Sequence, residues 1–112
     1  MRIKDIQKWE KEFSNKKGIA KDKEKATKIA IFKLTEEVGE ICKAVLENKW
    51  NEVPAEVTDV IVFACKVANI AEEFYGAEEL TKVLKRKLDY CEKRNYNKET
   101  NKLNKPRNKE FK

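Results

Sequence analysis

The sequence contains no histidine, and its three cysteines, Cys42, Cys65 and Cys91, are far apart and form no CxxC pair. The missing imidazole excludes zinc sites built with His, His general bases and di-iron sites of the Glu-x-x-His type. An odd number of widely spaced cysteines is typical of reduced, mostly buried packing residues. We therefore expect a cytoplasmic protein.

Turn-forming residues and long apolar runs are also scarce, with 3 Gly and 2 Pro in 112 residues. Few turn-formers together with many Lys, Glu, Ala and Leu favour helices over sheet. The most apolar stretch is interrupted by Asp59 and Lys66, which predicts no membrane-spanning helix. Residues 1–5 are not followed by an apolar run, so we expect no signal peptide.

Charge is abundant: 41% of the residues are charged and the formal net charge is +6. An excess of positive charge suits a polyanionic partner such as a nucleotide or a nucleic acid. Lysine-rich helices also commonly expose solvated charged faces, and this chain has no basic helix with interleaved aromatic side chains. The charge alone therefore does not favour binding to nucleic acid.

The spacing of apolar residues predicts an all-α fold in which each protomer is a four-helix bundle. The third expected helix is apolar on nearly all sides, so we expect oligomerisation to complete the bundle. We expect one helical domain over residues 1–94 and a basic C-terminal tail without regular structure over residues 95–112. The expected helices cover about residues 3–13, 22–48, 52–74 and 77–93.

Acidic residues stand at helical spacing in two of these helices. Asp59 lies within the most apolar stretch, where losing water costs free energy unless a partner or a metal compensates. Glu56, three residues earlier, shares its helical face. If the second and third helices pair antiparallel, four acids can converge: Glu37, Glu40, Glu56 and Asp59.

An all-carboxylate site without Cys or His suits Mg²⁺, with Mn²⁺ as a substitute. A purely structural alternative is that the acids pair with lysines, and Lys33 and Lys66 are the best candidates for Asp59. An aromatic side chain near such a site can serve as a platform for a base. Trp50, Phe63 and Trp9 are candidates, and each can instead be a core residue.

The segments 33–41 and 56–59, read as K-L-T-E-E-V-G-E-I and E-V-T-D, resemble the signature of MazG-like nucleotide pyrophosphohydrolases. A later segment, residues 87–94, is similar to the basic segment of this family. The resemblance implies the all-α NTP pyrophosphatase fold, a homodimer or homotetramer, and Mg²⁺-dependent cleavage of a nucleoside triphosphate to the monophosphate and pyrophosphate.

The resemblance also implies roles for individual residues. The metal ligands are Glu37, Glu40, Glu56 and Asp59, and the acids that handle the attacking water are Glu36 and Glu40. By the same resemblance, Lys87 and Arg94 contact phosphate. Together with the aromatic candidates, the expected substrate-binding residues are Lys33, Trp50, Phe63, Lys87, Cys91 and Arg94. Cys91 departs from the family, which often has Asn at this position, and a thiol is a weaker hydrogen-bond donor than an amide.

Two functions that involve no catalysis remain as alternatives. A helical protein of this charge can bind nucleic acid, or it can act as a subunit-interaction module whose acids serve only as ion-pair partners. The leading hypothesis is an enzyme that removes unwanted (d)NTPs, and the sequence does not define the base or the sugar.

Overall fold

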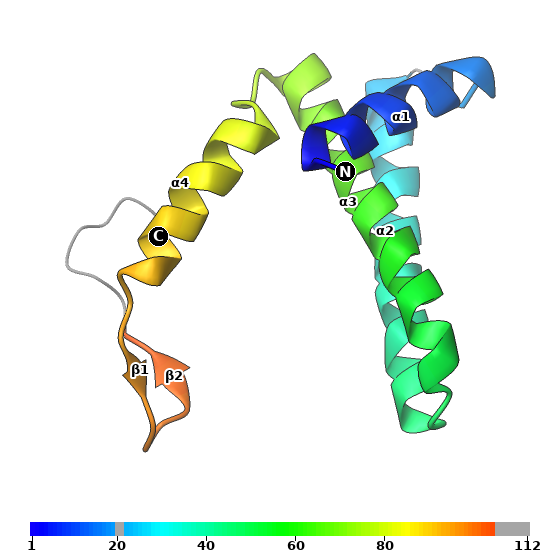
Figure 1. Cartoon of the computed structure of the whole chain (residues 1–112). Helices are drawn as coiled ribbons and strands as arrows, with labels where there is room; N and C mark the ends of the chain where they lie inside the picture. The colour runs from blue at the N-terminus through cyan, green and yellow to red at the C-terminus, as the bar shows by residue number, and fades with distance from the viewer. Residues whose placement is uncertain (20–21, 105–112) are drawn as a thin grey trace. The chain divides into compact units, whose positions relative to one another are not determined.

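The computed structural model describes residues 1–19 and 22–104, which belong to two compact units, Met1–Ala77 and one that begins at Glu78. Four α-helices occur among these residues, which confirms the predicted all-α fold (Figure 1). The elements are α1 (Ile3–Lys16), α2 (Lys23–Leu46), the 3₁₀-helix η1 (Trp50–Glu52), α3 (Val53–Tyr75), α4 (Leu80–Glu92), β1 (Tyr96–Asn97) and β2 (Lys102–Leu103).

The helix ends follow from local sequence. Asp22 caps α2, because its carboxylate accepts hydrogen bonds from the backbone N–H groups of Glu24 and Lys25 at 2.9 and 3.1 Å. Pro54 stands in the first turn of α3, where its missing N–H costs no helical hydrogen bond. Gly76 ends α3 in the left-handed region at φ 66°. Both ends of α3 were predicted within one residue.

Helices α2 and α3 run antiparallel and lie along each other in the first unit, joined by the short η1 segment (Figure 1). The buried residues Ala26 and Ala30 of α2 pack with Ile70 of α3, and Val67 covers this cluster. Two alanines four residues apart leave little side-chain volume on this face of α2, which allows the helix axes to approach closely. This pairing sets the register of the acidic residues further along both helices.

Helix α1 is attached to α3 by a buried polar network. The Asn69 amide donates to the backbone carbonyl of Gln7 at 2.9 Å and to the Glu10 carboxylate at 2.8 Å. Gln7 in turn donates to the Asn69 side-chain oxygen at 3.0 Å. Glu10 also forms an ion pair with Lys66 at 3.4 Å. Because buried polar groups lose water, this mutual pairing is what makes their burial tolerable.

Within a single chain α3 is not buried on all the sides that its apolar residues occupy. Val57 and Ile61 are exposed, and so is Asp59. In the first unit α1 and α2 pack against α3 (Figure 1), and some of its apolar side chains stay exposed. Asp59, which we expected to lose much of its water, is thus exposed to solvent in a single chain.

The second unit contains α4 followed by an antiparallel pair of strands, in which Tyr96 faces Leu103 and Asn97 faces Lys102. The expectation of an irregular tail after residue 94 is thus wrong for residues 96–103. The Asn97 side chain accepts from the backbone of Glu99 and Thr100, and this local turn makes the hairpin possible. The remainder of the expected tail, residues 105–112, lies outside the described residues.

No helix within residues 1–19 and 22–104 has both the length and the apolar composition that crossing a bilayer requires.

Whether α4 completes a four-helix bundle with the first unit stays a prediction.

Candidate metal centre

Three of the predicted ligands meet between α2 and α3. One carboxylate oxygen from each of Glu37, Glu56 and Asp59 lies within 4.8 Å of the other two. Glu37 and Glu56 are half-buried, and Asp59 is exposed. Three hard oxygen donors at this separation can surround one divalent cation.

The backbone explains this convergence. Glu56 and Asp59 are three residues apart on α3, so both project from one face. The short connection through η1 returns the chain directly, which places the first turns of α3 beside the second half of α2. Glu37 then faces the two acids from across the helix pair.

The electrostatic surroundings of Glu37 are unfavourable to its negative charge. Partial burial raises the pKa of the Glu37 carboxyl group, and the negative charges of Asp59 and Glu56 raise it further. Glu36 and Glu40 add smaller contributions in the same direction. A bound cation would relieve this repulsion.

The lysines that were considered as structural partners pair elsewhere. Lys33 forms an ion pair with Glu36 at 3.4 Å, and Lys66 pairs with Glu10 at the same distance. Within the described part of the chain, no lysine or arginine lies within 4.0 Å of the carboxylates of Glu37, Glu56 or Asp59. The geometry therefore does not support the alternative in which these acids serve only as ion-pair partners.

Glu40 and Glu36 lie next to the three-residue group without joining it. Glu40 is exposed and lines a small pocket of about 80 Å³ with Glu56, at the corner where α2, η1 and α3 meet. Glu36 is exposed and held by Lys33. The structure thus brings together three of the four predicted ligands and leaves Glu40 on an adjacent turn of α2.

The candidate base-binding residues occupy different environments. Trp50 is exposed in η1, close to the corner pocket, whereas Phe63 is half-buried one turn after Asp59 on α3. Trp9 is exposed on α1, where its ring stacks on Phe13 with centroids 4.9 Å apart. An exposed indole such as Trp50 is available for stacking, while Phe63 is partly committed to packing.

Lys87, Cys91 and Arg94 belong to the second unit, and their distance from the acids is not defined. Arg94 donates to the backbone carbonyls of Leu103 at 2.9 Å and Asn104 at 3.1 Å, so part of its guanidinium holds the end of the hairpin. Cys91 is half-buried and Lys87 is exposed. Their roles at the site stay predictions.

Comparison with protein families matches residues 23–97 to the MazG nucleotide pyrophosphohydrolase domain. The chain belongs to this family. The matched residues include α2, η1, α3 and α4, and thus all four predicted metal ligands. Comparisons with curated proteins and with solved structures gave no match.

The residues present fit the cation that a MazG domain needs. Glu37, Glu56 and Asp59 offer only oxygen atoms, and no histidine or cysteine joins them. This donor chemistry selects hard divalent cations over zinc or copper. The raised pKa of Glu37 and the lack of a neighbouring cation show that the charge of the cluster is not balanced by the described protein groups.

Sequence reasoning missed the buried polar network of this MazG chain. Lys66 and Asn69 interrupt the apolar pattern of α3, and Gln7 and Glu10 stand on the inner side of α1. Lys66 interrupts the apolar pattern of the sequence, but its partner is Glu10 rather than the expected Asp59. The signal that could have found the network is the i, i+3 spacing on both helices, which places two polar groups on each packed face.

Proposed function

We propose that this MazG chain is a Mg²⁺-dependent nucleoside triphosphate pyrophosphohydrolase that releases a nucleoside monophosphate and pyrophosphate. The observation that supports this proposal is the convergence of the Glu37, Glu56 and Asp59 carboxylates, beside which no lysine or arginine of residues 1–19 and 22–104 forms an ion pair. Membership of the MazG family supplies the reaction class.

The acids serve as metal ligands and as proton acceptors in this proposal, and Glu40 is a candidate for both roles. Glu37, Glu56 and Asp59 hold the cation, and Glu40 joins them from the corner pocket. A bound Mg²⁺ supplies charge neutralisation for the triphosphate and makes coordinated water more acidic. Glu36 or Glu40, both exposed beside the ligands, accepts the proton of the attacking water.

The substrate contacts come from basic and aromatic side chains. Lys87 and Arg94 bind the phosphates, and the remaining N–H groups of Arg94 suffice because a guanidinium has five donors. Trp50 stacks on the base, since its ring is exposed in η1 near the acids. Lys33, Phe63 and Cys91 are the further candidates for contact with the nucleotide.

The proposal includes a homo-oligomer in the cytoplasm. A second copy of the chain can bury the exposed apolar side chains of α2 and α3 in an interface. The three cysteines are free, which suits a reducing compartment.

A panel of ribonucleoside and deoxynucleoside triphosphates, assayed for pyrophosphate release with Mg²⁺ or Mn²⁺, tests the function. We expect release from at least one nucleotide, and a loss of at least about 100-fold in Asp59→Asn and Glu37→Gln, because removing a metal ligand removes the charge stabilisation of the transition state. Glu12→Gln is the matched control, since Glu12 is an exposed acid on α1 outside the MazG match. Inactivity of the folded wild-type protein on the whole panel contradicts the proposal.

A further inference from the structure

The side chain of Arg94 is held by the hairpin that follows it in the second unit. Arg94 lies two residues beyond the end of α4 and is half-buried. Its Nε–H group donates to the Asn104 carbonyl at 3.1 Å, and its Nη2 group donates to the Leu103 carbonyl at 2.9 Å. Because a guanidinium is planar, hydrogen bonds from two of its nitrogens fix both its position and the orientation of its plane.

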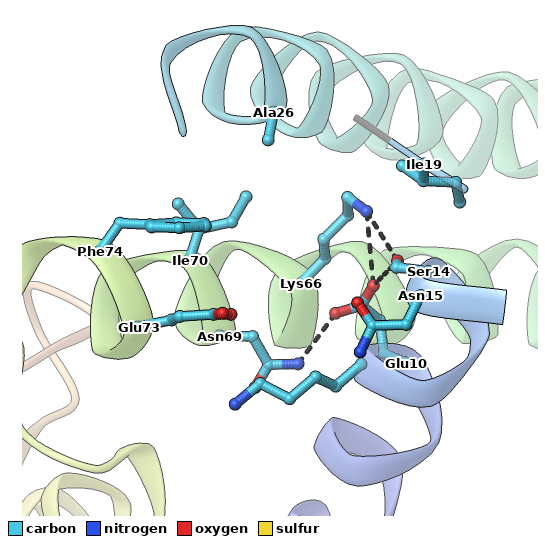
Figure 2. Close-up of a pocket in the computed structure, with 11 residues that line it drawn as sticks. Glu10, Ser14, Asn15, Ile19, Ala26, Lys66, Asn69, Ile70, Glu73 and Phe74 are labelled. Carbon is cyan, nitrogen blue, oxygen red and sulfur yellow. Dashed lines mark hydrogen bonds and ion pairs between the residues drawn. The ribbon is translucent and has the colours of Figure 1, made fainter. Parts of the chain in front are cut away.

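The positive charge of Arg94 is not balanced by an acid. Other cations of the chain pair with carboxylates, as Arg86 does with Glu78 at 2.6 Å and the buried Lys66 with Glu10 at 3.4 Å (Figure 2). Within residues 1–19 and 22–104, no carboxylate forms an ion pair with Arg94. The two carbonyls that hold Arg94 are neutral, so its full positive charge is left for an anion.

The hydrogen bonds of Arg94 occupy one edge of the guanidinium and leave the other open. A guanidinium has five N–H donors, and the two carbonyls take the edge formed by Nε and Nη2. The edge formed by Nη1 and Nη2 keeps one parallel N–H group on each nitrogen. This fork matches two oxygens of a phosphate group, so holding the side chain and binding a phosphate do not compete.

The hairpin is formed by local hydrogen bonds of its own turn. The Asn97 side-chain oxygen accepts from the backbone N–H groups of Glu99 and Thr100 at 2.9 and 3.2 Å. The Tyr96 hydroxyl donates to the Asn101 side-chain oxygen at 2.8 Å. Since an isolated pair of strands is only marginally stable, loss of one of these side chains is enough to open the hairpin. Opening it would release the carbonyls from the guanidinium.

We propose that the hairpin is a positioning element, which holds Arg94 by one edge so that its other edge makes a bidentate contact with a phosphate group of the nucleotide. This inference rests on the proposed function, in which Arg94 binds phosphate. Leu103 and Asn104, which supply the carbonyls, lie beyond residues 23–97 of the MazG match. A segment of this chain outside the family domain thus fixes a side chain inside it, and a side chain that is already fixed loses less entropy on binding.

Inorganic tripolyphosphate is the probe, because it has the phosphate chain of a nucleoside triphosphate without base or sugar. It is titrated into ¹⁵N-labelled full-length protein without metal or nucleotide. We expect a resolved Nε–H signal of Arg94 that shifts saturably and persists in the complex, since the phosphate takes the other edge. Arg94→Ala should weaken binding at least about tenfold. Arg94→Lys should lose most of the same affinity, because it keeps the charge but has no fork.

Two variants open the hairpin without changing the charge. Asn97→Ala removes the turn acceptor, and Asn101→Val places a β-branched residue at φ 56°, where it is strained. Both should lose the Nε–H signal of Arg94 and most of the affinity that Arg94→Ala loses, and neither should weaken binding further when combined with Arg94→Ala. Asn95→Ala is the matched control. The Asn95 side chain forms no hydrogen bond within the described residues, and its carbonyl, which accepts from the Asn104 N–H at 2.7 Å, is kept.

The proposal is overturned if the wild-type protein does not bind tripolyphosphate, or if both hairpin variants bind it as tightly as the wild type. It is also overturned if a hairpin variant weakens binding equally with and without Arg94, because the hairpin would then act through another group. No hydrolysis is measured in this titration. Inactivity on the nucleotide panel would therefore leave its result standing, and its failure would leave the panel result standing.

Discussion

Glu37 experiences the clearest electrostatic conflict in the described chain. It is half-buried, and the acids around it all raise its pKa. Such a group stabilises the fold while it is protonated and becomes a cost once it ionises. A site that is destabilising when empty is what a metal centre requires, since the cation then gains binding free energy by removing the repulsion.

This conflict predicts a pH dependence of stability in the metal-free protein. The folded-state pKa of Glu37 is raised, so the folded chain binds more protons than the unfolded chain between the two pKa values. Its contribution to the free energy of unfolding is present below the ordinary glutamate pKa and is lost as the pH rises through the raised value. The variant Glu37→Gln has no ionisable group at this position, so this pH-dependent contribution to its free energy of unfolding is absent.

Urea unfolding in EDTA at a series of pH values measures the effect. We expect the stability of Glu37→Gln relative to wild type to increase as the pH rises from about 4 to about 7, across and above the ordinary glutamate range. A constant difference across this range contradicts the account of Glu37.

The sequence pattern identified the acids but not their environments. The spacing in residues 36–40 and 56–59 predicted the convergence of Glu37, Glu56 and Asp59. The exposure of Asp59 could not be predicted, because it depends on which neighbours cover α3. The pairing of Lys66 with Glu10 was also missed, since these residues are 56 positions apart and their contact follows from how α1 packs.

At the scale of the elements, helix bounds were predictable where local chemistry determines them. Asp22, Pro54 and Gly76 mark the ends of α2 and α3 through hydrogen bonding or backbone geometry that depends on neighbouring residues alone. The hairpin that pairs Tyr96 with Leu103 was not predicted. Asn residues in this segment favour a turn, and Asn101 adopts φ 56° there. The segment is nevertheless charged and weakly apolar, which is more typical of a tail without regular structure.

Replacement of glycine by alanine is expected to change the stability of the protein in opposite directions at two positions. Gly76 adopts φ 66°, so Gly76→Ala should destabilise the protein by about 1 kcal/mol through backbone strain. Gly39 lies inside α2, and Gly39→Ala should stabilise the metal-free protein by about 0.5–1 kcal/mol. An added Cβ meets no atom within 4 Å at either position. The two changes in stability therefore reflect backbone conformation and not steric clash.

Urea unfolding of both variants in EDTA measures these changes. If both substitutions shift stability in the same direction, helix ends in this chain are not determined by the backbone preference that we assign to Gly76.

At the scale of the whole molecule, the first unit leaves several large apolar side chains exposed. Large apolar side chains are exposed along α2 and α3, and Phe32 has a relative exposure of 73%. Exposed apolar side chains are covered when a protein interface forms over them. The expected association into a dimer or tetramer would cover side chains that a single chain leaves in water.

Light scattering coupled to size-exclusion chromatography tests the association. We expect a dimer or tetramer at micromolar concentration, and a shift toward monomer in Phe32→Glu, because a carboxylate in an apolar interface loses its water without a partner. Lys28→Glu, one turn earlier on α2 and also exposed, should leave the assembly unchanged. A monomeric wild-type protein contradicts this expectation.

The central claim is that Glu37, Glu56 and Asp59 together hold a divalent cation, and Mn²⁺ binding followed by electron paramagnetic resonance tests it most directly. The account predicts that wild-type protein and Glu12→Gln sequester Mn²⁺, that Mg²⁺ competes for the same site, and that Asp59→Asn loses at least about tenfold in affinity. Mn²⁺ that stays free in the presence of folded wild-type protein, or that binds Asp59→Asn equally well, would contradict the account.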